Sequence, residues 1–349
     1  MKKKIAIIGH FGGDKDFFDG QTVKTKILFD ELSKAIDWEI KKVDTYLNKT
    51  NKIKLLFVTF KCLFSCKKII ILVSGNGMKL FFPLLFFFAK FFHKDIYHDV
   101  IGGNLDKNVN KNPKYIKYLN SFKYNWVETE NLKTRLQNEG VTNCEVIPNF
   151  KRLKTVELSD SSFEFDEPYR FCTFSRVIKE KGISDAVIAV DNINKQHKRI
   201  ICKLDIYGVI DENYNEEFFD LLKGKEHYVK YCGIVPYDES VETLKSYYGL
   251  LFPTFWKGEG FPGTVVDAFS AGLPVIATDW NCNKEIITDL VDGIIYPSDT
   301  VKTLRDAIEW SVENKTLFLA MKEKCLEKAR KYQPDEYIKT IIERIGLNC

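Results

Sequence analysis

Along the first 150 residues, short apolar runs alternate with longer segments whose apolar residues recur every three or four positions. The longer segments, at residues 22–35 and 53–66, have the spacing of helices. The short runs resemble buried strands and lie at residues 5–9, 69–74, 95–101 and 144–149. Strands that are largely apolar and separated by helices predict a parallel sheet covered on both faces.

The same alternation restarts after residue 150. Further apolar runs lie at residues 170–176, 203–208, 228–233, 248–253, 273–278 and 292–297. A chain of 349 residues is also too long for one typical compact core. We therefore predict two α/β, Rossmann-like domains, residues 1–150 and 151–330, that face each other across a cleft. Open parallel sheets bind ligands beyond the carboxyl ends of their strands, so the cleft is the predicted site.

Residues 254–285 hold a loop rich in glycine that leads into a short helix. Helical character begins at Thr264 and stops at Gly272. The free amides and positive dipole at the start of such a helix favour phosphate. Glu259 and Asp267 flank this helix start, where carboxylates can accept hydrogen bonds from sugar hydroxyls. The segment suits a ligand that carries both diphosphate and sugar.

Spacing alone leaves a plainer interpretation open. Thr264 and Asp267 fit a capping box, in which the carboxylate satisfies only the helix start. Glu259 could equally be a solvated loop residue.

Residues 259–278 read E-G-F-x5-D-A-x-S-A-G-x-P-V-I-A-T. This pattern resembles the signature of retaining glycosyltransferases of the GT-B fold, in the large family 4 (glycosyl transferases group 1) that includes sucrose synthases and bacterial enzymes of capsule and surface polysaccharide. That family usually has a second Glu where this chain has Asp267, which keeps the charge but shortens the reach. The resemblance implies that Glu259 holds the donor sugar and that Asp267 binds the ribose. It places the donor phosphates along Gly260, Phe261, Pro262, Gly263 and Thr264.

A pair of basic residues, Arg176 and Lys181, follows the first apolar run of the second half. An Arg-x4-Lys pair alone is common and usually solvated. Here it resembles the R-x4-K-G motif of the same family. The resemblance implies that both cations stabilise the diphosphate as it leaves the sugar. Arg offers a fixed fork of donors and Lys a mobile point charge.

A second glycine-rich loop, residues 9–22, follows the first predicted strand. Such a loop also suits a dinucleotide-binding dehydrogenase, but this one lacks G-x-G-x-x-G. The resemblance implies that Gly13 lets the backbone approach the donor phosphate. It assigns four residues of this loop to the acceptor side, namely Gly12, Gly20, Gln21 and Thr22.

His98 follows a predicted strand and precedes two glycines. A lone histidine is more often structural than catalytic. A histidine at a matching place in the family lies near the transferred sugar, so the resemblance assigns His98 a catalytic role.

Outside the glycine-rich loop 9–22, where Asp14-Lys15-Asp16 forms an Asp-x-Asp, the sequence contains no acidic cluster with metal-ligand spacing. We therefore expect no metal or other cofactor, and expect Arg176, Lys181 and helix-end amides to balance the phosphate charge.

The expected donor is a nucleotide-sugar, with UDP-sugar as the first choice, and the expected acceptor is a glycan, in particular a lipid-linked one. Two other functions stay open, a GT-B sugar-nucleotide epimerase and a non-catalytic scaffold subunit at the membrane. The resemblance also implies that residues 331–349, with a helix at about 334–345, cross back onto the first domain.

Basic residues are concentrated in the first half of the chain. Residues 1–150 hold 25 Lys and Arg against 15 Asp and Glu, although the whole chain has a net charge of only +4. Residues 41–94 hold eleven lysines and one acid, Asp44. Such a surplus indicates a polyanionic partner, a membrane surface or nucleic acid, or else a solvated basic face. We expect peripheral membrane contact through this segment and no nucleic acid.

The stretch 79–92 is strongly apolar but too short to span a bilayer, which needs about twenty residues. It predicts either a buried helix of the first domain or a shallow membrane contact beside lysines. Nine cysteines without a disulfide or zinc pattern favour reduced thiols in a cytosol. The N-terminus resembles a first strand and not a signal peptide. Together these features predict a cytoplasmic protein at the inner face of the membrane.

Overall fold

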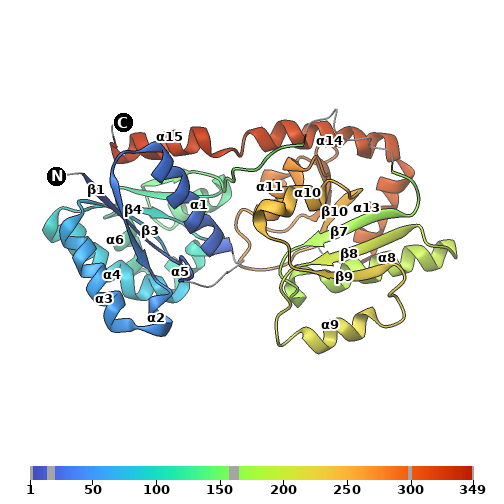
Figure 1. Cartoon of the computed structure of the whole chain (residues 1–349), viewed down its shortest axis with the longest axis horizontal. Helices are drawn as coiled ribbons and strands as arrows, with labels where there is room; N and C mark the ends of the chain where they lie inside the picture. The colour runs from blue at the N-terminus through green and yellow to red at the C-terminus, as the bar shows by residue number, and fades with distance from the viewer. Residues whose placement is uncertain (1–2, 14–19, 157–164, 298–300, 348–349) are drawn as a thin grey trace. The chain divides into compact units, whose positions relative to one another are not determined.

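The computed structural model describes residues 3–13, 20–156, 165–297 and 301–347 (Figure 1). The chain divides into two compact units. The first comprises Met1–Arg152 and Gln333–Cys349, and the second comprises Leu153–Tyr332. Each unit holds one six-stranded sheet in which all paired strands are parallel. The prediction of an α/β chain with two Rossmann-like, parallel-sheet halves is confirmed.

The first sheet has the strand order β2-β1-β3-β4-β5-β6. Its strands are β1 Lys4–Gly9, β2 Glu39–Asp44, β3 Lys68–Leu72, β4 Asp95–Asp99, β5 Tyr124–Val127 and β6 Cys144–Val146. Along β1, Ile5 and Ile7 enter one hydrophobic core, whereas Ala6 and Ile8 enter another. Successive side chains of a strand point to opposite faces, so each face of this sheet carries its own core.

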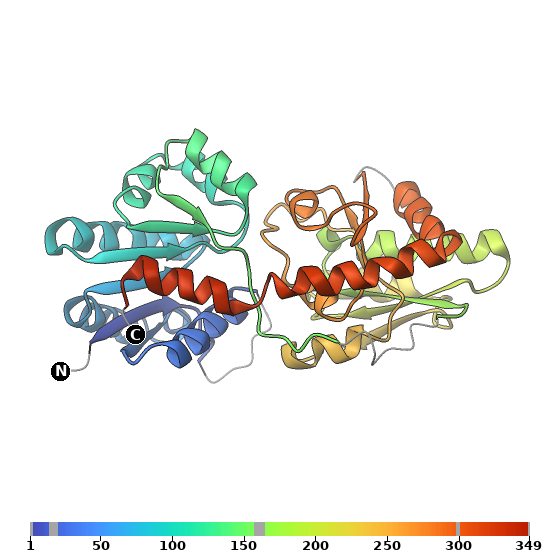
Figure 2. The same cartoon turned by 90° about the horizontal axis from the view of Figure 1, so that it is seen from above.

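Helices cover both faces of the first sheet. They are α1 Gly20–Ala35, α2 Leu47–Thr50, α3 Lys52–Ser65, α4 Gly75–Phe92, α5 Leu105–Lys111, α6 Lys114–Leu119, α7 Glu130–Asn138 and α15 Pro334–Ile345. Leu28 of α1 and Ile341 of α15 share the core of Ile5 and Ile7, and Figure 2 shows α15 alongside this sheet. α3, α4 and α7 contribute to the core on the other face. The helix predicted at 334–345 is confirmed as α15.

The second sheet has the strand order β12-β11-β10-β7-β8-β9. Its strands are β7 Tyr169–Phe174, β8 Cys202–Tyr207, β9 Val229–Gly233, β10 Gly249–Phe252, β11 Val275–Thr278 and β12 Gly293–Tyr296. Counted within the unit, this is the order 3-2-1-4-5-6 of dinucleotide-binding sheets. The order reverses between β7 and β10, and in such sheets the ligand lies at the carboxyl ends of the two strands that flank the reversal.

The second unit has helices on both faces of its sheet as well. They are η2 Lys179–Lys181, α8 Ile183–His197, α9 Asn215–Leu222, η3 Tyr237–Glu239, α10 Ser240–Leu244, α11 Gly263–Ser270, α12 Asn283–Ile286, α13 Val301–Glu313 and α14 Lys315–Arg330. α8, α9 and α13 pack in one hydrophobic core and α10 and α11 in another.

Two strands, β2 and β5, were missed by the sequence analysis. β2 is an edge strand with the sequence EIKKVD, and Val43 is its one buried residue. It therefore lacks the apolar run on which strand prediction relied. β5 has only four residues, YNWV. The run predicted at 144–149 is a strand only as far as Val146.

The apolar stretch 79–92 belongs to α4 and is only half-buried. Phe81, Phe82 and Leu85 face the core, as the buried-helix interpretation predicts. Phe87 and Phe91 are exposed. Among the described residues, no helix is both long enough and apolar enough to cross a bilayer.

Candidate functional site

A buried ion pair joins the two strand ends at the reversal of the second sheet. Lys181 ends the 3-10 turn η2 after β7, and Glu259 lies in the loop after β10. Lys181 Nζ lies 2.5 Å from Glu259 Oε2, and both side chains are about nine-tenths buried. The pair therefore occupies the place in the sheet where doubly wound folds bind their ligands.

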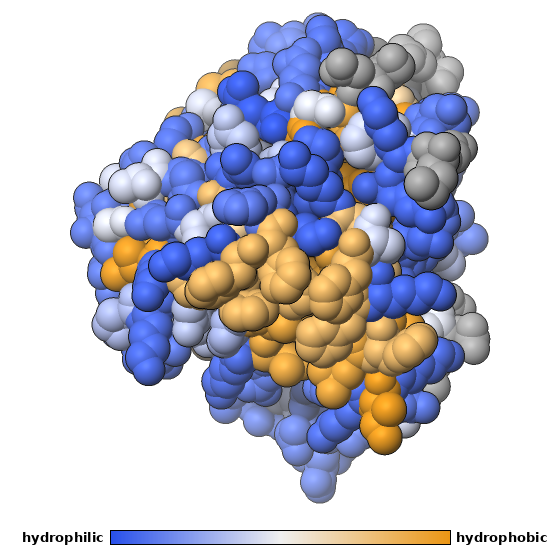
Figure 3. All heavy atoms as spheres, turned by 90° about the vertical axis from the view of Figure 1, so that its left-hand side faces the viewer, coloured by the Kyte–Doolittle hydropathy of each residue, from blue (hydrophilic) through white to orange (hydrophobic). Residues whose placement is uncertain are grey.

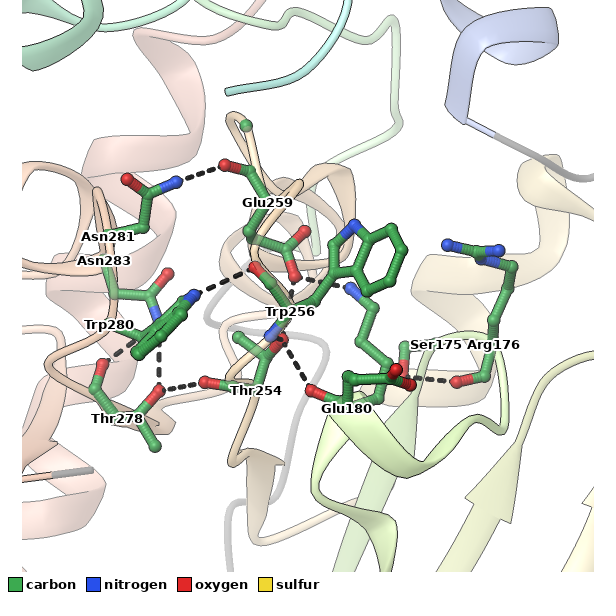
Figure 4. A network of polar contacts seen from close by, with 12 residues as sticks. Ser175, Arg176, Glu180, Thr254, Trp256, Glu259, Thr278, Trp280, Asn281 and Asn283 are labelled. Carbon is green, nitrogen blue, oxygen red and sulfur yellow. Dashed lines mark hydrogen bonds and ion pairs between the residues drawn. The ribbon is translucent and has the colours of Figure 1, made fainter. Parts of the chain in front are cut away.

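Hydrogen bonds fix the loops around this ion pair (Figure 4). Thr254 Oγ1 donates to Glu259 Oε2 at 2.9 Å, so two donors hold the same carboxylate oxygen. The carbonyl of Thr254 accepts from Thr278 Oγ1 at the end of β11, at 2.6 Å. The amide of Phe255 donates to the carbonyl of Glu180 at 2.9 Å. The carboxyl ends of β7, β10 and β11 thus form one hydrogen-bonded layer.

Gly182 allows the close approach of two of these strand ends. Its φ is +67°, in the left-handed region that favours glycine. A Cβ at this position would lie 2.1 Å from the carbonyl oxygen of Pro253, which directly follows β10. The glycine of the R-x4-K-G motif therefore sets the distance between the loops of Lys181 and Glu259.

Arg176 lies in the loop after β7 and is exposed. Its guanidinium carbon lies 5.6 Å from the centre of the Trp256 ring, within the range of a cation–π contact. The carbonyl of Trp256 accepts a hydrogen bond from Trp280 Nε1 at 2.9 Å. The aromatic ring thus supports an accessible cation beside the Lys181–Glu259 pair.

The loop from Gly260 to Thr264 leads into α11. The carbonyl of Gly260 accepts a hydrogen bond from the Cys282 thiol, and the ring of Phe261 packs against Tyr332. The carbonyl of Glu259 accepts a hydrogen bond from the Asn281 amide. The backbone of this loop is therefore held by residues that follow β11.

The start of α11 has no side-chain cap. Pro262 is its N-cap residue and Gly263 its first helical residue. The capping box considered for Thr264 and Asp267 is therefore wrong, because Thr264 lies inside the helix. The Thr264 hydroxyl is buried and has no hydrogen-bond partner among the described residues. An uncapped helix start with its positive dipole end suits an anion.

Asp267 lies inside α11 and is 3% exposed. Its Oδ1 accepts a hydrogen bond from Ser240 Oγ at 3.2 Å. Ser240 is the first residue of α10, so this contact connects α10 to α11.

The sequence analysis did not single out Gly182, Thr254, Trp256 or Asn281. Thr254 and Trp256 follow β10 closely, and Asn281 follows β11. Because the carboxyl ends of parallel strands meet at one edge of the sheet, polar residues just after a predicted strand are the signal that could have found them.

In the first unit, an aspartate organises the loop after β1. Asp44 Oδ2 accepts a hydrogen bond from the amide of Gly13 at 2.7 Å, and Oδ1 accepts from the amide of Phe11 at 2.9 Å. Gly12 and Gly13 have φ of +88° and +59°. The Gly13 amide, which the resemblance directs at the donor phosphate, already has an anionic partner within its own unit. Residues 14–19 of this loop lie outside the described residues.

The other end of this loop lies at the reversal between β1 and β3. Gly20 is the first residue of α1. Gln21 donates to the carbonyl of Leu72 at 3.3 Å and accepts from Ser74 Oγ at 2.9 Å. Thr22 Oγ1 and His10 Nδ1 are 2.7 Å apart. Polar side chains therefore gather at the carboxyl edge of this sheet too.

His98 lies within β4, inside the strand predicted at 95–101, and does not follow a strand end. It is fully buried, its ring lies edge-on to Phe82, and Nδ1 is 3.2 Å from Asn125 Oδ1. Burial lowers the pKa of His98 to about 4, because the core disfavours the charged ring. This placement is that of a neutral core histidine and gives no support to a catalytic role.

Lys24 forms a buried cluster with two acids that the sequence analysis also missed. Its Nζ lies 2.7 Å from Asp99 Oδ1 and 2.9 Å from Glu128 Oε1. Burial alone would lower the pKa of Lys24, but the two carboxylates outweigh it and raise that pKa to about 12. Burial raises the pKa of Asp99. The cluster joins α1 to the ends of β4 and β5 and explains how three charges are buried there.

Within the part of the chain that the structure describes, no three His, Cys, Asp or Glu side chains are grouped so as to hold a metal ion. The cations of the second unit's site are the side chains of Arg176 and Lys181.

Two solved structures share this fold over nearly their whole length. Sucrose-phosphate synthase from Thermosynechococcus elongatus has a TM-score of 0.75 at 14% identity, with 98% of both chains covered. The Anabaena protein HepE, in complex with UDP, has a TM-score of 0.72 at 15% identity, with 99% of both chains covered. At these identities the likeness shows the fold alone, which is the GT-B fold.

Sequence comparison extends the likeness to a family. An uncharacterized glycosyltransferase of Methanocaldococcus jannaschii is 21% identical over 190 residues, which are 51% of this chain and 47% of that protein. The chain spans less than half the length of the curated relatives it matches. Residues 155–332, just over half of the chain, match the family described as Glycosyl transferases group 1. The chain therefore belongs to the glycosyl transferases group 1 family.

Proposed function

We propose that this chain transfers a sugar from a UDP-sugar to a hydroxyl group of a glycan acceptor, with retention of configuration at the sugar. The observation that carries the proposal is the buried Lys181–Glu259 pair at the reversal point of the second sheet. Family membership over residues 155–332 supports the reaction class. The structure of HepE in complex with UDP, which shares the fold, supports the choice of donor.

In this proposal the diphosphate is held by Arg176 and Lys181. When the bond between the sugar and the diphosphate breaks, the electron pair leaves with the phosphate oxygen. Negative charge grows there, and two nearby cations stabilise it. Arg176 is exposed and can follow the ligand, whereas Lys181 is held in place by Glu259. With both cations in place, we propose a reaction without a metal ion.

The carboxylates and the helix start have separate roles in the proposal. Glu259 accepts hydrogen bonds from the donor sugar, and Asp267 binds the ribose. The amides of Gly263 and Thr264, at the uncapped start of α11, bind phosphate together with the backbone of Gly260 and Phe261, while Pro262 shapes the turn. The side chain of Asp267 must then give up or share its contact with Ser240, since it is buried in the unit.

The first unit is proposed to bind the acceptor. Gly12, Gly20, Gln21 and Thr22 lie along the loop and helix start after β1, which is where an open parallel sheet accepts a ligand. The acceptor oxygen forms the new bond to the sugar, and its proton passes to the departing diphosphate on the same face.

We propose that the acceptor is a lipid-linked glycan, that the chain belongs to the retaining family 4, and that it acts in capsule or surface-polysaccharide synthesis at the cytoplasmic face of a membrane. The domains of this proposal are residues 1–150 for the acceptor, 151–330 for the donor and 331–349 as the returning helix.

The proposal is tested by incubating the protein with radiolabelled UDP-sugars, a bacterial lipid extract and EDTA. We expect label in the lipid phase, with the donor's anomeric configuration kept when the product is examined by NMR. Arg176→Ala should lower the rate about a hundredfold. Lys179→Ala, an exposed change on the same turn as Lys181, is the control and should keep the rate. Conversion of the donor to its epimer without acceptor, or no labelled product from any nucleotide-sugar, would contradict the proposal.

A further inference from the structure

The first unit carries an exposed apolar face on two neighbouring helices. Nine of the seventeen exposed large apolar side chains among the described residues belong to α3 and α4, so they are concentrated and not scattered. On α3 they are Ile53, Leu56, Phe57, Phe60 and Phe64. On α4 they are Leu80, Phe87, Phe91 and Phe92. We call these nine residues the aromatic face.

The spacing of the aromatic face shows that it is a second apolar side of each helix. The exposed positions of α3 follow a helical period, and its buried positions Leu55, Cys62 and Leu63 lie on the other side. Phe57 is 69% exposed and Phe91 is 62% exposed. The core of the unit is therefore complete without these side chains. Leaving so much apolar surface in water is unfavourable, which indicates that the face contacts another molecule.

Ring contacts make the face continuous across the two helices. The ring of Phe64 lies 5.9 Å from that of Phe92 on α4 and 6.5 Å from that of Phe60 on its own helix. Phe87 and Phe91 are 4.9 Å apart along α4. Figure 3 shows a broad hydrophobic patch on this side of the molecule, with hydrophilic residues around it.

Exposed lysines accompany the aromatic face. They are Lys49, Lys52, Lys54, Lys61, Lys67 and Lys90. Residues 45–94 contain no Asp or Glu, and none of these six lysines forms an ion pair within the described part of the chain. The aromatic face is apolar, and the lysines that accompany it have no acidic partners. Such a face is complementary to a surface that has negative charges on the outside and hydrocarbon beneath them.

We infer that α3 and α4 dock the chain on an anionic lipid bilayer, with the aromatic face at the depth of the headgroups and the lysines on the phosphates. Helices that lie in the interface have this division into an apolar face and a basic border. A second copy of the chain is a poorer occupant, because a two-fold contact would set the same lysines against one another. The inference does not rest on the proposed function, since docking requires neither donor nor acceptor.

The test is flotation of the full chain with vesicles of phosphatidylcholine alone and of phosphatidylcholine with phosphatidylglycerol. We expect binding to the anionic vesicles only, weakened by high salt. Lys52→Gln with Lys54→Gln should reduce the partition coefficient roughly fivefold for each lysine removed. Phe57→Ser with Phe91→Ser should reduce it by at least about tenfold, because two aromatic rings no longer enter the interface.

A matched control removes exposed apolar side chains elsewhere. Phe219→Ser with Leu317→Ser, at 45% and 59% exposure in the second unit, should bind vesicles as the unchanged protein does. Circular dichroism checks that each variant is folded. Equal binding to neutral and anionic vesicles, or no binding to either, would overturn the inference. So would self-association in sedimentation that Phe57→Ser abolishes while vesicle binding is absent, since the face would then belong to a second copy.

Discussion

Lys181 and Glu259 are 78 positions apart in the sequence, yet Lys181 Nζ lies 2.5 Å from Glu259 Oε2. Their strands, β7 and β10, are neighbours because the strand order of the second sheet reverses between them. The close approach of the two loops depends on Gly182, and Thr254 adds a hydrogen bond to the same carboxylate oxygen. A buried cation and a buried carboxylate are thus held together at the point where this kind of sheet binds its ligand.

Because both side chains are buried, removing either one leaves the other charge without its partner. Lys181→Met or Glu259→Gln should each lower the free energy of unfolding by about 3 to 5 kcal/mol. The double variant should lose clearly less than the sum of the two, since no unpaired charge remains. Urea unfolding of the four proteins measures this coupling.

An exposed pair in the same unit provides the comparison. Lys179 and Glu217 are 3.3 Å apart and more than half exposed. Their double-variant cycle should give a coupling below about 1 kcal/mol. Equal coupling in the two cycles would mean that burial does not strengthen the Lys181–Glu259 pair.

Gly182 should be much harder to replace than a glycine with open space around it. Alanine there combines a positive φ with a Cβ that meets the Pro253 carbonyl, so Gly182→Ala should cost about 3 kcal/mol or more in unfolding free energy. Gly224 has a similar φ of +74° and open space at the Cβ position. Gly224→Ala should therefore cost only about 1 kcal/mol, the backbone strain alone. If thermal unfolding shows equal losses, the close approach at Pro253 is not what requires the glycine.

His98 should make the first unit sensitive to acid. Its folded-state pKa of about 4 lies below the ordinary value of 6.5, so the unfolded chain binds the proton first as the pH falls. The stability that depends on the neutral ring is complete above 6.5 and is lost toward 4, by about 3 kcal/mol. His98→Gln should remove this part of the pH dependence. His227→Gln, at an exposed position, should leave it unchanged, and identical pH profiles for all three proteins would refute the assignment.

Lys24→Met should destabilise the first unit and weaken the loss of stability in acid. Without the lysine, Asp99 and Glu128 lose the cation that compensates their burial, at a cost of about 3 to 5 kcal/mol at neutral pH. Burial already raises the folded-state pKa of Asp99, and without the neighbouring cation that pKa should rise further. The variant should therefore take up more protons on folding and lose less stability as the pH falls. Lys34→Met, which removes an exposed lysine beside the buried Glu31, is the control. A variant whose stability falls with pH as steeply as that of the unchanged protein would contradict this account.

The sequence predicted the architecture more completely than it predicted the contacts between side chains. Strands with an apolar run were found because both of their faces are buried, whereas the lysine-bearing edge strand β2 carries no such run. Helix α15 was expected from the family resemblance, and the structure shows Pro334 at its start and Gly346 at its end. The residue types of the Lys181–Glu259 site were visible, but their pairing follows from the strand order, which no local pattern encodes.

His98 shows that sequence analysis can also suggest a functional residue where the structure has a core residue. Its place near a strand end and two glycines suggested a site, yet the side chain points into a core formed with Phe82 and Phe122. The direction of a side chain on a buried strand depends on the packing of α4, which lies earlier in the chain. Likewise, a helical period at 53–66 predicted α3 but not that a second, exposed side of the helix is aromatic.

The most direct test of the central claim is calorimetric titration of the full chain with UDP, GDP and ADP in the presence of EDTA. We predict that UDP binds without a metal ion and that Arg176→Ala weakens this binding about tenfold or more, the value of hydrogen bonds to a charged group. Lys179→Ala should bind UDP as the unchanged protein does. Absence of binding by all three nucleotides, or UDP binding that Arg176→Ala leaves intact, would contradict a donor site at Arg176, Lys181 and Glu259.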